Sequence, residues 1–165
     1  MRKEHVPVSL HFLRDFDRFL DRINVCTMTE CIFCRIIRRE VPAEVLYEDD
    51  DVLAILDINP IHYGHALVLP KRHCLDFLAL PPSCYSSVLT AAHRVTKALV
   101  SALQLEGYNL FTNNGRIAGQ SVFHFHLHVT PRYADDNIRF VLELKKYADG
   151  EMASTARLIR DHLHH

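Results

Sequence analysis

The sequence has no excess of charge of either sign, because 19 Lys and Arg side chains stand against 20 Asp and Glu, a net charge of −1. A protein held to nucleic acid by bulk electrostatics needs a clear basic excess, so we expect no nucleic-acid partner. The chain also lacks an apolar run near the ~20 residues that a membrane-spanning helix requires, so we expect no membrane partner. Internal repeats and low-complexity stretches are missing as well. With 165 residues, 48% of them hydrophobic, we expect a soluble single-domain protein with a real core.

The sequence shows no secretory signal peptide, because charged residues such as Arg14, Asp15 and Asp17 interrupt the apolar residues near the N-terminus. The five cysteines, an odd number, then favour a reducing compartment over a disulfide framework. We expect a cytoplasmic protein, with a nuclear location also open. Residues 1–28 form an extension in which apolar side chains at spacings of three or four predict an amphipathic helix over 9–23, packed on the domain. Whether this extension is an organellar targeting signal is left open.

Residues 29–144 have the pattern of one compact α+β domain. Residues 145–165 form a C-terminal helical tail, in which the helix is expected to begin near Met152. Apolar periodicity predicts a short helix over 32–39 and a long one over 83–105. Runs of apolar residues predict strands over 45–48, 52–58, 65–70, 108–112 and 122–130, followed by a weak strand that ends near 144. Because short links join several of these strands, we expect a largely antiparallel sheet with helices packed on it.

The segment from Phe123 to Val129 alternates strictly between apolar residues and histidines. Successive side chains of a strand point to opposite faces, so His124, His126 and His128 are expected to share one face while the apolar residues bury the other. A merely solvated face more often carries Thr, Lys, Glu or Ser, so the pattern indicates a functional site. Imidazole could act there as a metal ligand, as an acid or base, or as a nucleophile.

The loop just before this segment favours one of these chemistries. It supplies amide and hydroxyl donors together with glycines that let backbone N–H groups approach an anion: Asn113, Asn114, Gly115, Gly119, Gln120 and Ser121. Donors without an acidic pair suggest a site for a phosphate group. A neutral imidazole that faces an electrophilic phosphorus, with donors around the leaving oxygen, is arranged for covalent phosphoryl or nucleotidyl transfer.

The seven residues from His124 to Thr130 resemble the signature of the histidine triad (HIT) family, whose last position is usually apolar rather than a threonine. Further segments are similar to that family and occur in the same order: Cys31-Ile32-Phe33-Cys34, Asp57-Ile58-Asn59-Pro60, Gly64-His65, Pro70-Lys71-Arg72-His73 and Gly119-Gln120-Ser121-Val122. The resemblance covers about residues 29–140. It implies a HIT-like α+β fold: an antiparallel five-stranded sheet with one long helix and a few short ones.

The resemblance also implies an activity. His126 would be the nucleophile that attacks the α-phosphate of a nucleotide conjugate, and water would then release a nucleoside monophosphate from the nucleotidyl-histidine. His128 would contact phosphate oxygens, while His124 and His65 would help to orient the triad. The family positions for phosphates, leaving group and ribose hydroxyls correspond to Asp57, Asn113, Gly119, Gln120 and Ser121. The implied substrates are purine phosphoramidates, adenylates or dinucleoside polyphosphates, and the implied assembly is a homodimer.

A second group of residues has the spacing of metal ligands. Cys31 and Cys34 are separated by two residues, but two thiolates need two more ligands to complete a tetrahedral zinc site. In family members with these cysteines two histidines complete the site, and they correspond to His73 and His124. Such a zinc would be structural, because no position is left for water. The alternatives are four neutral residues without metal, and a redox pair, which would normally lie in a thioredoxin-like βαβ unit that the sequence lacks.

Two other functions stay open beside a covalent nucleotide hydrolase. A nucleotide-binding regulatory or scaffold protein would keep the same site with little turnover, and hydrolysis of any adenylate conjugate would separate the two. A zinc hydrolase that uses all three triad histidines as ligands is disfavoured, because no Glu or Asp lies near the triad in sequence to act as its base.

Overall fold

The computed structural model describes residues 30–139 and 141–163. The extension over residues 1–28, with its expected amphipathic helix, lies outside the described residues. Within the described ranges no helix is long and apolar enough to cross a membrane.

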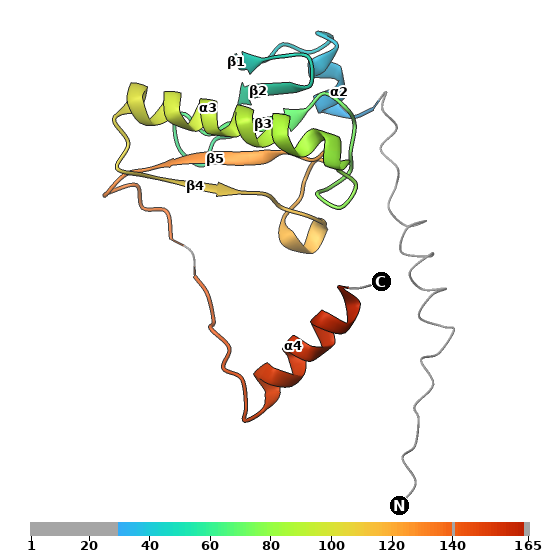
Figure 1. Ribbon diagram of the computed structural model, residues 1–165. Coiled ribbons are helices and arrows are strands. Elements are labelled where there is room, and N and C mark those ends of the chain that lie inside the picture. Colours follow the sequence, from blue (N-terminus) through green and yellow to red (C-terminus); the bar gives the residue numbers. More distant parts are fainter. Residues whose placement is uncertain (1–29, 140, 164–165) are drawn as a thin grey trace, which may run out of the picture.

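A five-stranded antiparallel sheet lies at the centre of the fold, with strand order β1-β2-β3-β5-β4 (Figure 1). The strands are β1 (Val45–Glu48), β2 (Val52–Leu56), β3 (Ala66–Pro70), β4 (Gly107–Phe111) and β5 (Leu127–Arg132). β2 and β3 are built almost entirely of Val, Leu, Ile and Ala, and are buried nearly throughout because helices cover both faces of the sheet. The predicted α+β fold with a five-stranded antiparallel sheet is confirmed.

The two sheet faces are covered by helices of very different length. α3 (Tyr85–Leu103) lies along one face (Figure 1) and buries residues spaced by three or four, among them Val88, Val95 and Leu99. α2 (Ile32–Ile37) packs on the other face. Because side chains alternate along a strand, β2 supplies Val52 and Ala54 to the α3 side, and Leu53 and Ile55 to the α2 side. Short 3₁₀ turns η1 (Pro82–Cys84) and η2 (Arg116–Ala118) complete the connections.

β5 begins later than the strand predicted over 122–130, and it continues through Pro131. Residues 122–126 lie outside the strand ladder because the Phe125 N–H donates to the carbonyl of Cys74, at 2.6 Å, instead of to a neighbouring strand. β3 pairs with only the first half of β5, so the second half has β4 as its sole neighbour. A proline, which has no N–H to donate, is tolerated in such a half-paired stretch.

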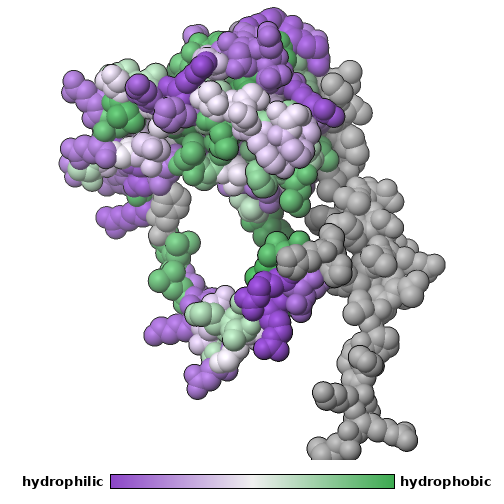
Figure 2. Space-filling view, in the orientation of Figure 1, coloured by the Kyte–Doolittle hydropathy of each residue, from purple (hydrophilic) through white to green (hydrophobic). Residues whose placement is uncertain are grey.

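The chain leaves the sheet after β5 as an extended arm that ends in α4 (Glu151–His162), which stands apart from the sheet in Figure 1. α4 confirms the helix predicted from about Met152, and none of its residues is buried. The weak strand predicted to end near 144 does not form in the described residues, because this stretch runs without a neighbouring strand. Apolar side chains of the arm, including Val141 and Leu144, are exposed, and apolar patches are visible on it in Figure 2.

Candidate functional site

The triad histidines gather on the α2 side of the sheet, where the chain enters β5. His128 stands opposite Leu67 of β3, whose side chain belongs to the apolar cluster on that side. The rings of His126 and His128 have centroids 4.8 Å apart. The Phe33 ring of α2 packs edge-on against both other histidines, 5.1 Å from His126 and 5.8 Å from His124. The predicted shared side is therefore observed, although His128 alone of the three belongs to the strand.

The protonation of His126 follows from its hydrogen bond. Its Nδ1 lies 2.6 Å from the carbonyl oxygen of His124. A carbonyl oxygen accepts hydrogen bonds and never donates, so Nδ1 carries the proton. Burial lowers the pKa of His126, because the buried imidazolium would lose its hydration, and this favours the neutral ring. The neutral ring then keeps an unprotonated Nε2.

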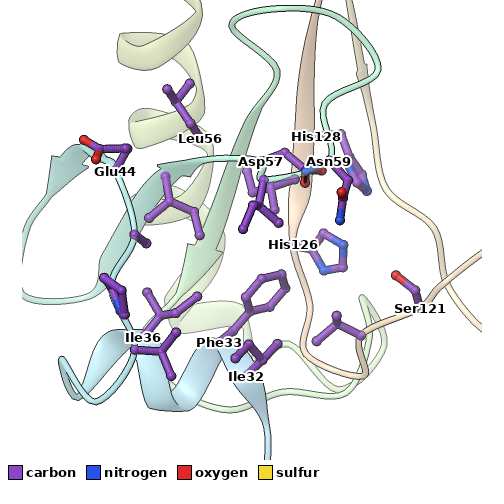
Figure 3. A pocket seen from close by; sticks show the side chains of 17 residues that line it. Ile32, Phe33, Ile36, Glu44, Leu56, Asp57, Asn59, Ser121, His126 and His128 are labelled. Carbon is purple, nitrogen blue, oxygen red and sulfur yellow. Dashed lines mark hydrogen bonds between the residues drawn. The ribbon is translucent and has the colours of Figure 1, made fainter.

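His126 lines a cavity of about 650 Å³ between α2 and the sheet (Figure 3). One part of the cavity wall is apolar, with contributions from Phe33, Ile36 and Ile55. In Figure 3 the side chains of Asp57, Asn59, Ser121, His126 and His128 lie together at the other part. A cavity with an apolar compartment and a convergent polar end suits an amphiphilic small molecule.

His128 is held by a hydrogen-bonded chain. The Ile61 N–H donates to Nδ1 of His65 at 3.2 Å, so the proton of that neutral ring sits on Nε2. His65 Nε2 in turn lies 2.9 Å from Nδ1 of His128 and donates to it. The proton of His128 is thereby placed on Nε2, which is buried and has no hydrogen-bond partner among the described residues. His128 therefore offers an N–H donor to a bound molecule.

Burial favours the neutral forms of the His128 and His65 rings. Burial, with His126 and His65 close by, lowers the pKa of His128 to about 4. Burial also lowers the pKa of His65, against the opposing effect of the Asp57 carboxylate 3.3 Å from its Nδ1. Asp57, His65 and His128 are close enough to suggest a metal site, but His65 turns a different nitrogen to each neighbour. One ligand atom of each residue lies within 4.8 Å of the other two, but His65 Nε2 and His128 Nδ1 are already hydrogen-bonded to each other, so the three groups are arranged as a chain.

The loop before the triad contributes less to the cavity wall than the sequence suggests. Ser121 is exposed and lines the cavity, whereas Asn113, Gly119 and Gln120 do not line it. The side-chain amide of Gln120 is buried and hydrogen-bonded to backbone groups. Gly119 adopts φ +88°, a left-handed conformation that favours glycine, so its role in this structure is the turn.

The first triad histidine also belongs to a cluster of four possible metal ligands. Their ligand atoms all lie within 4.8 Å of one another, and the residues are Cys31, Cys34, His73 and His124. His124 Nε2 lies 2.8 Å from the Pro70 carbonyl and so donates to it. Its unprotonated Nδ1 faces the two sulfurs at 3.6 Å each and His73 Nδ1 at 3.3 Å. His73 Nδ1 lies 3.3 Å from the Cys34 sulfur. Two thiols and two imidazole nitrogens that converge in this way are a donor set for a tetrahedral metal ion.

The geometry also separates the roles of the triad. The His124 ring faces the cysteines, whereas Nδ1 of His126 is occupied by a carbonyl and Nδ1 of His128 by His65. Within the described residues the three rings thus form no common ligand set, so the zinc hydrolase with three triad ligands has no support. Sequence reasoning missed three backbone groups that hold the histidines: the Pro70 and His124 carbonyls and the Ile61 N–H. No side-chain motif could have revealed them.

Comparison with known proteins identifies the class to which this fold and site belong. The HIT domain model matches residues 38–135, more than half of the chain. The chain therefore belongs to the HIT family.

Individual relatives agree with this assignment. An uncharacterised HIT-like protein of Methanocaldococcus jannaschii is 47% identical over 106 residues, which are 64% of this chain and 81% of the relative. The adenylylsulfatase HINT3 of Arabidopsis thaliana is 38% identical over 137 residues, 81% of this chain and 70% of the relative. A crystal structure of a Zn-bound histidine triad family protein from Mycobacterium smegmatis has a TM-score of 0.65 and 36% identity, and covers 82% of this chain and 99% of that chain.

Proposed function

We propose that this chain is a nucleotide hydrolase that acts at the α-phosphate of nucleoside phosphoramidates, adenylates or dinucleoside polyphosphates. The observation that carries the proposal is the unprotonated Nε2 of His126 on a ring that lines the cavity. Membership of the HIT family and the similarity to an adenylylsulfatase support nucleotide hydrolysis as the general activity. The covalent step is our inference from the geometry together with the resemblance to the family, and the substrate classes are those that the resemblance implies.

The reaction would proceed in two displacements at phosphorus. Nε2 of His126 attacks the α-phosphorus, a P–N bond forms, and the bond to the leaving group breaks with its electron pair on the leaving group. The ring becomes a cation, which the carbonyl of His124 stabilises by accepting the Nδ1–H bond. Water then attacks the phosphorus and the P–N bond breaks with its electron pair on Nε2, which restores the neutral ring. The proton that water loses to the solvent replaces the one that a basic leaving group, such as an amine, takes up from the solvent. The product is a nucleoside monophosphate.

His128 supplies the donor that this chemistry needs. Its Nε2–H has no partner among residues 30–139 and 141–163 and is oriented by the chain from Ile61 through His65. A preorganised donor that meets a phosphate oxygen as charge builds up on it lowers the barrier without reorganisation at the moment of reaction. His65 would act through His128, by fixing which of its nitrogens carries the proton.

The nucleoside would occupy the remainder of the cavity. Phe33, Ile36 and Ile55 form an apolar wall that suits the faces of a purine base. Asp57 stands between that wall and the histidines, and its carboxylate can accept hydrogen bonds from both ribose hydroxyls. The apolar wall offers little to distinguish one purine from another, so we propose a purine nucleotide without naming the base.

We also propose that the Cys31–Cys34–His73–His124 cluster holds a structural zinc. Zinc bonds of about 2.0–2.1 Å to nitrogen and about 2.3 Å to sulfur place the corners of a tetrahedron about 3.3 Å apart for two nitrogens, and about 3.6 Å apart for nitrogen and sulfur. The observed separations of 3.3 Å between the nitrogens and of 3.3–3.6 Å between nitrogen and sulfur are close to these values. The ion would cross-link the start of α2 to the segment that follows β3 and to the first histidine of the triad.

A substrate panel tests the proposed activity. Purified protein is incubated with adenosine 5′-phosphoramidate, adenylyl sulfate and diadenosine tetraphosphate, and release of adenosine monophosphate (AMP) is followed by chromatography. We expect multiple turnovers with at least one of them, and an acid-labile, base-stable nucleotidyl adduct on His126 after rapid quenching. AMP binding without turnover of any of the three would instead support a regulatory or scaffold protein.

A further inference from the structure

The side-chain amide of Gln120 makes all of its observed hydrogen bonds to backbone groups. It is 5% exposed. Its Oε1 accepts the Gly115 N–H at 2.8 Å, and its Nε2 donates to the carbonyls of Leu75 at 2.7 Å and Val122 at 3.1 Å. The amide has two N–H donors, and both are used. Gln120 therefore acts on the chain around it, and no donor is left for a phosphate.

Leu75 belongs to a bridging segment, residues 73–77, that contacts both sides of the site. The Cys74 carbonyl accepts the Phe125 N–H at 2.6 Å, in the middle of the triad. The Phe77 N–H donates to Oδ1 of Asn114 at 2.8 Å, in the loop. The first residue of the segment is His73, whose Nδ1 lies in the Cys/His cluster. The bridging segment thus runs from the cluster to the loop that ends in Ser121.

We propose that Gln120 is a positioning residue through which the Cys/His cluster controls how tightly the phosphate end of a nucleotide is bound. Ser121, which lines the cavity, stands between Gln120 and Val122, whose carbonyl Gln120 also holds. A shift of the bridging segment would be passed by the Leu75–Gln120 bond to Ser121. Displacements near 1 Å at a site cost on the order of 10²-fold in rate. The inference rests on the proposed function for the identity of the ligand.

Two substitutions separate this role from others. Gln120→Ala removes all three hydrogen bonds. Gln120→Glu keeps an acceptor for the Gly115 N–H but turns an oxygen toward the carbonyls of Leu75 and Val122. We expect both to weaken AMP binding by about 10-fold or more in calorimetric titrations, as a lost bond to a buried group would. Adenosine, which has no phosphate, should keep its affinity within about 2-fold, because the apolar wall is untouched. Ile117→Ala, at a fully exposed position of the same loop, is the matched control and should change neither affinity.

Hydrogen exchange of the ligand-free protein tests the positioning role directly. The Gly115 amide should exchange faster in Gln120→Ala than in the wild type, and should stay protected in Gln120→Glu. Amides of α3 should be unchanged in both variants, which shows that the fold is intact. Unchanged exchange at Gly115 in Gln120→Ala would overturn the proposal, as would an equal loss of AMP and adenosine affinity in that folded variant.

Metal removal tests the link to the cluster. Wild-type protein treated with a chelator should bind AMP more weakly and should exchange faster at Phe125 and Gly115, and reloading with zinc should reverse both changes. In Gln120→Ala chelation should cause no further loss of AMP affinity. If chelation lowers AMP affinity by the same factor in the wild type and in Gln120→Ala, a link through Gln120 is refuted. If the wild type binds no AMP, the proposed function fails, whereas the exchange data still decide whether the bridge exists.

Discussion

Replacing His126 with alanine is expected to lower turnover by at least about 10⁴-fold, or about 5.5 kcal/mol of transition-state stabilisation. The magnitude follows because, among the described residues, no second imidazole with a free unprotonated nitrogen lines the cavity. The free nitrogen of His128 carries a proton, so it has no lone pair to offer. Only the slow direct attack of water would remain.

The substitution also has a structural cost that must be separated from the chemical one. Alanine leaves the carbonyl of His124 without its donor, which costs about 1–3 kcal/mol. His126→Asn is the matched control, because a short side-chain amide can donate to that carbonyl but provides no nucleophilic nitrogen. We expect Asn to raise the thermal midpoint relative to Ala while turnover stays equally low. Both variants should bind AMP within a few-fold of the wild type.

The assay is steady-state release of AMP from whichever conjugate the wild type hydrolyses, followed by peptide mapping of the quenched protein. The wild type should carry the nucleotidyl group on His126, and neither variant should carry it. A variant with alanine at position 126 that keeps more than about a tenth of wild-type turnover would refute covalent catalysis at this residue. An adduct mapped to another residue would do the same.

Three further expectations follow from the rest of the chain. Metal analysis should find about one zinc per chain. Cys31→Ser should lower the thermal midpoint clearly while it changes turnover little, because the free energy of metal binding contributes to folding. Protein without zinc and with fully titratable thiols would contradict this. Light scattering should give a homodimer, because β4 is an edge strand with exposed Tyr108 and Leu110; a monomer at high concentration would contradict it. Removal of residues 1–27 should leave turnover unchanged, because no site residue lies in that extension, and a large loss in a folded truncation would show that it shapes the cavity.

Much of the fold could be predicted because the apolar residues follow two clear patterns along the sequence. The apolar residues of α3 recur at three and four, and continuous apolar runs define β2 and β3. Each of these elements is stabilised by its own burial, so its sequence carries its structure. The strand predicted over 122–130 failed at its first half for the opposite reason. There the Phe125 N–H is bound by Cys74, a partner about fifty residues away that alternation cannot reveal.

The candidate site could likewise be predicted only in part. Side chains with distinctive chemistry, such as His126 and the Cys31–Cys34 pair, are visible in the sequence and come together in the structure as expected. Gln120 shows where this reasoning ends. A glutamine N–H can donate to a phosphate or to a backbone carbonyl, and which one it meets depends on where Leu75 and Val122 lie after folding.

His124 connects the two halves of the site through different atoms of one residue. Its ring faces the cysteine sulfurs, and its backbone carbonyl lies 2.6 Å from Nδ1 of His126. A metal ion that fixes the ring also fixes that carbonyl, because the side chain and the backbone of one residue move together. The carbonyl in turn decides which nitrogen of His126 carries the proton. A metal ion that never touches the substrate would in this way maintain the one protonation state in which His126 can attack phosphorus.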